Sequence, residues 1–204
     1  MSVLIRDPDL AADVVKARAE SDGDRWTEVW DGVIVMPALP NNEHQTLVQR
    51  LSVPFSAVIN WDTGDVVHPG ANVSDREHGW KLSYRIPDIL VALAGGRAKD
   101  CGTHWCGGPD MVVEVQSPSE DPRDKLPFYA AAGTREVLVI DRDPWCLELF
   151  RLDEGVLRSV GRSDETGSPE LVSSVLPLGF RLRSESPRSV IVVTHRESRQ
   201  TWTA

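Results

Sequence analysis

The chain has 204 residues, which is enough for one domain with a sizeable core but short for two. Its 41% hydrophobic and 26% charged residues are ordinary for a globular protein and exclude the disordered and fibrous classes. With 31 acidic against 22 basic residues the net charge is −9, which argues against binding nucleic acid by charge alone, because contacts with phosphates need basic groups.

From the sequence we expect neither a membrane span nor a signal peptide. No stretch approaches the roughly 18 consecutive apolar residues of a membrane span, and residues 1–14 lack the basic and apolar regions of a signal peptide. We therefore expect a cytoplasmic protein without membrane contact. Its three cysteines are expected to be free thiols, because the cytosol keeps thiols reduced.

The first third of the chain predicts two helices separated by a hairpin. Apolar residues recur at helical spacing over 7–20. Two β-prone runs then meet at Asp31-Gly32, a dipeptide that tolerates the positive φ angles of a tight turn. A second helix is expected over 43–59, with an asparagine before it as N-cap and Pro54 as a kink or break.

Two apolar runs in the middle of the chain are each interrupted by one acid. Residues 86–93 (IPDILVAL) contain Asp88, and residues 111–115 (MVVEV) contain Glu114. Their nearly continuous apolar character predicts two buried strands.

The remaining sequence predicts one more helix and several strands. Asp121 can cap a helix that has Pro122 at its first position and Gly133 at its end. Strands are expected, some weakly, over 137–141, 146–152, 156–160, 176–183 and 189–194. Strands interleaved with a few helices indicate an α/β or α+β domain with a mixed sheet.

The two buried acids raise the question of what compensates their charge. An ionised carboxylate in a sheet costs several kcal/mol unless it is paired, hydrogen-bonded or bound to a cation. If the strands are neighbours, Asp88 and Glu114 can converge on a hard cation such as Mg²⁺ or Mn²⁺. The alternative is structural: Asp88 starts its strand at a Pro-Asp turn, and Glu114 pairs with an arginine such as Arg85 or Arg123.

Lys125 follows Asp121 by one turn of the predicted helix, and Tyr129 follows Lys125 by another. A lysine near a metal-bound water can offset negative charge on a phosphorane-like transition state. On spacing alone an exposed Asp121–Lys125 ion pair explains this lysine better.

Several segments, taken in order, carry a family resemblance. They are WTEVWDGVIVMP with NNEHQ after it, RIPDI, and GPDMVVEVQSPSEDPRDKLPFYAAAGTREVLVID. Together they resemble the Uma-two family of restriction endonucleases, in the PD-(D/E)xK nuclease superfamily, over roughly residues 25–182. The most specific part is EV-x-SPS followed by lysine, tyrosine and glycine.

This resemblance implies a restriction-endonuclease-like fold, with a mixed central sheet flanked by helices, over residues 1–186 as a single domain that begins with the short helix. Residues 187–204 are expected to form a C-terminal strand and tail. The implied activity is Mg²⁺-dependent hydrolysis of phosphodiester bonds in DNA, in which the cation lowers the pKa of an attacking water. Homodimers are common among such nucleases, although no residue here demonstrates one.

Residue by residue, the resemblance makes Asp88 and Glu114 metal ligands and lets Glu28, from the first hairpin, complete the acidic site. His44 matches the histidine that opens the second helix, and its role is open. Tyr129 is either a polar partner near the site or a core aromatic, with the core role favoured.

Gln116 departs from the pattern, because it stands where Glu-x-Lys has its catalytic lysine. An amide can orient a water but contributes no positive charge. Lys125 matches a lysine of the family's following helix and could bring its ammonium into the same space. If it cannot, the protein becomes a catalytically weak module with the nuclease fold that binds DNA or protein partners.

A second metal signal is weaker. Cys101, His104 and Cys106 place three soft ligands within six residues, so zinc is conceivable. Structural zinc sites have four protein ligands, and no second cluster supplies a fourth. We favour a loop near the acidic strands that takes no part in the site.

Trp202 is expected in a mobile tail.

Overall fold

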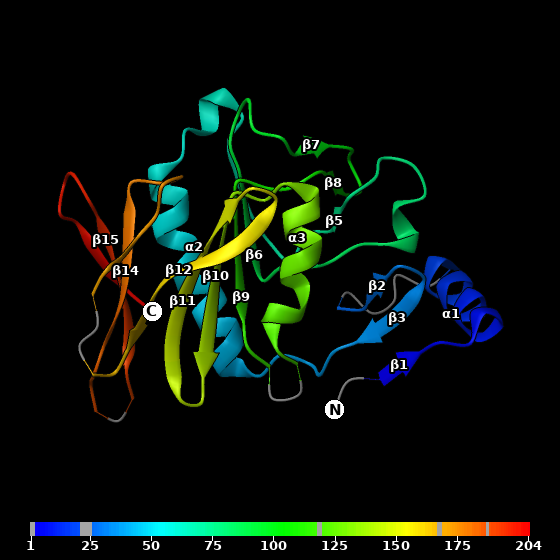
Figure 1. Cartoon of the computed structure of the whole chain (residues 1–204), viewed down its shortest axis with the longest axis horizontal. Coiled ribbons are helices and arrows are strands. Elements are labelled where there is room, and N and C mark those ends of the chain that lie inside the picture. Colours follow the sequence, from blue (N-terminus) through cyan, green and yellow to red (C-terminus); the bar gives the residue numbers. More distant parts are fainter. Residues whose placement is uncertain (1–2, 21–25, 118–119, 167–168, 187) are drawn as a thin grey trace.

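The computed structural model describes residues 3–20, 26–117, 120–166, 169–186 and 188–204. Its centre is a six-stranded sheet in the order β12-β11-β10-β9-β6-β4 (Figure 1). The strands are β4 (Val66–Pro69), β6 (Ile89–Ala92), β9 (Met111–Val115), β10 (Glu136–Arg142), β11 (Trp145–Asp153) and β12 (Val156–Asp164). Only β9 and β10 are parallel among these neighbours, so the sheet is mixed, as the sequence predicts.

Alternate residues of the central strands pack on opposite faces of this sheet. Val113 and Val115 of β9 share a cluster with Leu47 of α2 (Asn42–Val58), whereas Val112 packs with Tyr129 of α3 (Leu126–Ala132). The two helices therefore cover opposite faces, with α3 in front of the sheet and α2 behind it in Figure 1. Because side chains alternate along a strand, Glu114 belongs to the α3 face with Val112.

A C-terminal sheet packs against the same core as α2. It consists of β13 (Leu171–Val172), β14 (Leu178–Arg183), β15 (Val190–His195) and β16 (Thr201–Thr203), in that order. Phe180 of β14 meets Phe55 of α2 with ring centroids 5.9 Å apart. The expectation of a mobile tail at Trp202 is wrong, because this residue lies in β16, pairs with Val193 and packs on the core.

The N-terminal elements form a separate small layer at the other end of the molecule (Figure 1). They are β1 (Val3–Ile5), α1 (Pro8–Glu20), β2 (Glu28–Trp30) and β3 (Val33–Met36), and the sheet order is β1-β3-β2. Asp31 and Gly32 have φ values of 48° and 84°, which confirms the predicted tight turn. Val29 bridges to Tyr84, which ties this layer to the segment that leads into β6.

A third small sheet packs against β6 and β4 and carries the cysteine hairpin. Its strands are β5 (Val73–Ser74), β8 (Trp105–Cys106) and β7 (Lys99–Asp100), in that order. In chain order the 3₁₀ turn η1 (Trp61–Thr63) lies between α2 and β4, and η2 (Trp80–Leu82) lies between β5 and β6.

Helix α2 begins as the sequence predicts. The Asn41 side chain caps α2 by accepting from the His44 N–H at 2.9 Å. The helix then continues across Pro54, so of the kink or break expected there, the break is wrong. None of the helices among the described residues is long and apolar enough to cross a membrane.

The third helix differs from its prediction in its first turn. Asp121 caps it and Pro122 opens it, but Pro122–Lys125 form a 3₁₀ turn (η3) and α3 begins only at Leu126. Pro127 has no N–H to continue the α-helical ladder, so the tighter turn before it is retained. Gly133, at φ 90°, ends the helix as expected.

Candidate active site

Strand register brings the two predicted acids to one place. In the β6–β9 pair Ile89 is opposite Val113, so the next residues along, Asp88 and Glu114, are also opposite one another. Opposed residues of an antiparallel pair point to the same face. Both acids line one cavity of about 40 Å³, although Asp88 lies just before β6 rather than inside it.

Both carboxylate oxygens of Asp88 are engaged. One lies 2.7 Å from Nε2 of His44, and the other accepts the backbone N–H of Val115 at 2.7 Å. A carboxylate only accepts, so Nε2 of His44 carries the hydrogen. His44 itself is buried, and its Nδ1 has no partner among the described residues. His44, whose role the sequence leaves open, therefore orients the Asp88 carboxylate.

Glu114 is held between a phenol and an ammonium. The Tyr129 hydroxyl donates to Oε1 at 2.5 Å, and Nζ of Lys125 donates to Oε2 at 3.1 Å. Glu114 is only 3% exposed. Burial raises the pKa of Glu114 to about 8, against the opposing effect of the Lys125 ammonium.

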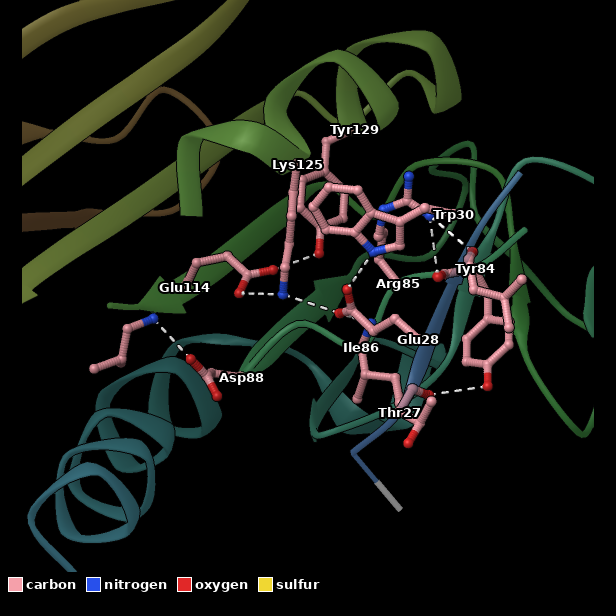
Figure 2. Close-up of polar contacts among 12 residues, drawn as sticks. Thr27, Glu28, Trp30, Tyr84, Arg85, Ile86, Asp88, Glu114, Lys125 and Tyr129 are labelled. Atoms are coloured by element: carbon pink, nitrogen blue, oxygen red, sulfur yellow. Dashed lines mark hydrogen bonds and ion pairs between the residues drawn. The ribbon is translucent and has the colours of Figure 1, made fainter. Parts of the chain in front are cut away.

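Glu28 brings the N-terminal layer into the site. Its Oε2 accepts from Nε1 of Trp30 at 2.7 Å, and its Oε1 accepts from the Ile86 N–H at 2.7 Å and from Nζ of Lys125 at 2.9 Å. Figure 2 shows this carboxylate at the centre of the group, with Lys125 between it and Glu114. The site is thus assembled from two layers of the molecule.

Lys125 is the cation of the cavity. It is 7% exposed and bridges the Glu28 and Glu114 carboxylates. Burial by itself lowers the pKa of Lys125, but these carboxylates outweigh burial and raise it, so the side chain stays an ammonium. The alternative of an Asp121–Lys125 ion pair is wrong, because Asp121 pairs with Arg123.

The arginines proposed as structural partners of Glu114 lie elsewhere. Arg123 binds Asp141 and Glu148.

Arg85 donates to the carbonyls of Val29 and Tyr84. Its guanidinium is stacked between the rings of Trp30 and Phe128, 4.4 and 4.3 Å from their centroids. Stacked against Trp30, Arg85 steadies the indole that donates to Glu28.

Gln116 does not line the cavity. It lines a neighbouring hollow, whereas Lys125 lines the cavity of Asp88 and Glu114. Tyr129 combines both roles considered for it, since it is fully buried in the core and donates to Glu114.

Sequence reasoning missed one carboxylate. Glu120 also lines the cavity, and its buried Oε1 has no partner among the described residues. Burial raises the pKa of Glu120. The residues around Glu120 in the sequence are polar, so they give no sign that this side chain is buried. An acid is recognisable as buried from the sequence only when it interrupts an apolar run.

The donor set of the cavity suits a hard divalent cation. Asp88, Glu114 and Glu120 offer only oxygen, and each carboxylate oxygen can accept more than one interaction. Within the described ranges no three His, Cys, Asp or Glu side chains enclose a metal site. Magnesium needs only one or two carboxylates, with waters and substrate phosphates completing its shell, so this cavity fits it.

The zinc alternative gains no support. Both ring nitrogens of His104 have partners, Thr103 Oγ1 at 3.1 Å and the Arg76 carbonyl at 3.1 Å. Cys101 and Cys106 are free and partly exposed on the β7–β8 hairpin. The described residues that line the cavity of Asp88 and Glu114 include none from this hairpin.

Comparison with known proteins identifies the family and the fold of the chain. Residues 11–185 match the Uma2 family, described as "Putative restriction endonuclease". A solved structure from Anabaena variabilis, described as a "putative nuclease belonging to DUF820", superposes with a TM-score of 0.58 at 17% sequence identity, over 73% of this chain and 82% of that one. No curated protein matches the chain. At this identity the likeness shows the fold, a mixed α+β nuclease-like architecture, as the sequence predicts.

Proposed function

Because the chain belongs to the Uma2 family of restriction endonuclease-like proteins, we propose that it is a Mg²⁺-dependent endonuclease that hydrolyses phosphodiester bonds in DNA. The observation that carries the proposal is the meeting of Asp88, Glu114 and Lys125 at one cavity. Two carboxylates and a fixed ammonium are the groups that such a hydrolysis needs.

Asp88 and Glu114 are the residues that would hold the cation, Mg²⁺ or Mn²⁺. When bound, it would polarise the scissile phosphate and lower the pKa of a water. Around it, His44 and the Val115 N–H fix the Asp88 carboxylate, and Tyr129 fixes that of Glu114. Oriented ligands of this kind bind metal better than free ones.

Lys125 and Glu28 act as a pair. The Lys125 ammonium offsets negative charge on the phosphate oxygens, and Glu28 holds it in place at 2.9 Å. Because the N-terminal hairpin supplies Glu28, its attachment through Val29 and Tyr84 matters for the position of the lysine. Glu28 therefore serves as a positioning residue.

Cleavage of supercoiled plasmid in Mg²⁺ or Mn²⁺ tests the proposal, with EDTA as the metal-free control. We expect Asp88→Asn, Glu114→Gln and Lys125→Met each to lower the rate by about 100-fold or more. Asp62→Asn, at an exposed turn, is the matched control and should cleave like the wild type. Undiminished cleavage in Lys125→Met would remove the lysine from the mechanism.

Metal binding can be measured without activity. Mg²⁺ or Mn²⁺ should raise the melting temperature of the wild type, and Asp88→Ala should abolish the gain. A protein that binds DNA but neither cleaves it nor responds to metal would be the catalytically weak module instead.

A further inference from the structure

A second hollow adjoins the candidate active site. It has a volume of about 420 Å³ and is lined by Asn41, Glu43, Gln116, Ser117, Arg142 and Asp143. Ser117 lines this hollow and the cavity of Asp88 and Glu114 alike, so the two spaces are neighbours. Its size is that of a small-molecule pocket and far exceeds what a water or a metal ion needs.

The hollow is built around a fixed guanidinium. Nε of Arg142 donates to the Gln116 carbonyl at 3.1 Å, and Nη1 contacts Oδ1 of Asn41 at 3.1 Å and Oε2 of Glu43 at 3.3 Å. These contacts tie the end of β10 to the start of α2. They also fix the backbone of Gln116 on the wall of the hollow.

Charge in the hollow does not favour a phosphate. Glu43 faces two arginines, Arg142 and Arg188, and the exposed carboxylate of Asp143 has no ion pair among the described residues. The residues that line the hollow carry one positive and two negative groups, so the hollow has no excess of positive charge. A neutral ligand with hydrogen-bonding edges fits this environment better than a phosphate does.

The Gln116 carboxamide has no hydrogen-bond partner within the described part of the chain, although its backbone is held. It offers one acceptor and two donors, and Asp143 beside it offers acceptors only. Glutamine reads the edge of adenine in this way, and carboxylates accept from the amino groups of bases. The unpaired donors and acceptors of the Gln116 carboxamide and the Asp143 carboxylate therefore match the edge of a nucleobase.

We propose that this hollow binds an unpaired base of the substrate strand next to the cleaved bond, with Gln116 and Asp143 hydrogen-bonded to its edge. The proposal rests on the nuclease function and adds a base preference to it. It also accounts for the residue that departs from the nuclease motif: Lys125 supplies the charge, and Gln116 contacts the base. A concave site of this kind takes a base that has left the duplex or belongs to a single strand.

Binding of fluorescein-labelled single-stranded dA, dC and dT decamers, measured by anisotropy in Mg²⁺, tests the proposal. Glu114→Gln serves as the background, so that the strands stay intact. In this background we expect at least about a fivefold difference in Kd between the best and the worst decamer. Adding Gln116→Ala should shrink the difference to less than about twofold, and Asp143→Asn should change the order of preference. Gln49→Ala, an exposed glutamine of α2, is the matched control.

The outcomes separate this proposal from the nuclease function. Cleavage of the decamers by the wild-type protein, with an unchanged base preference in Gln116→Ala, would overturn the base site and leave the nuclease intact. A preference that Gln116→Ala removes, in a protein that never cleaves, would support the base site and overturn the nuclease. Equal binding of all three decamers, or none, would overturn the base site.

Discussion

At the scale of single residues, the Glu114 carboxyl group links the site to the stability of the fold. Its pKa is raised to about 8 by burial, whereas its ordinary value is 4.5. Between these values the folded state binds more protons than the unfolded chain, so the free energy of unfolding falls as pH rises through this window. Glu114→Gln removes the ionisable group and keeps a polar side chain, so most of that fall should disappear.

Urea unfolding in EDTA at pH 5 and pH 9 measures this effect. Between pH 5 and pH 9 we expect the free energy of unfolding to fall by at least ~1 kcal/mol more in the wild type than in Glu114→Gln. Glu154→Gln, at an exposed turn, should behave like the wild type. Parallel pH profiles for wild type and Glu114→Gln would show that this carboxyl group ionises without cost.

The candidate residues were predictable from the sequence, but their partners were not. Asp88 and Glu114 stand out because each interrupts an apolar run. Lys125 meets Glu28 across 97 residues of chain, a contact that no local pattern encodes. Local spacing favours an Asp121–Lys125 pair, but in the structure the Lys125 ammonium donates to two buried carboxyl groups, those of Glu28 and Glu114.

At the scale of elements, Arg123 fastens η3 to the central sheet. Its guanidinium contacts Asp141 of β10 at 2.8 Å and Glu148 of β11 at 2.7 Å, and both acids are buried. These hydrogen bonds, to Asp141 first, raise the pKa of Arg123, so the clamp stays charged. Arg123→Met would leave two buried carboxylates without their cation and should destabilise the protein by ~2 kcal/mol.

Chemical denaturation of a small variant set tests the clamp. Changing Asp141→Asn and Glu148→Gln in the Arg123→Met background should recover most of the lost stability, because no buried charge then remains unpaired. Arg158→Met breaks an exposed pair with Asp153 and should cost less than ~0.5 kcal/mol. An equally small cost for Arg123→Met would show that the clamp contributes little.

Elements with a strong local signal were predicted, and those that depend on pairing were not. The Asp31-Gly32 turn and the Asn41 and Asp121 caps follow from local chemistry. In contrast, β1 and β16 have three residues each, and they become strands only because β3 and β15 offer partners. Such short edge strands have too little periodicity to be recognised in the sequence.

At the scale of the whole molecule, one core joins the central sheet, α2 and the C-terminal sheet. Buried residues from all three belong to a single apolar cluster, among them Leu51, Val113 and Phe180. A domain that shares its core in this way should unfold as one unit. The end of the chain takes part, because Ala204 is buried and exchanges two backbone hydrogen bonds with Ile191.

Removing residues 201–204 should therefore lower the stability of the whole domain and not only that of the sheet edge at β15. The truncation deletes the β15–β16 pairing and the packing of Trp202, and we expect the melting temperature to fall by ~5–10 °C in a single transition. Trp61→Ala, at an exposed tryptophan, should change it by less than ~2 °C. Calorimetry with two separate transitions would mean that the C-terminal sheet unfolds alone, in which case the shared apolar cluster does not couple the two sheets.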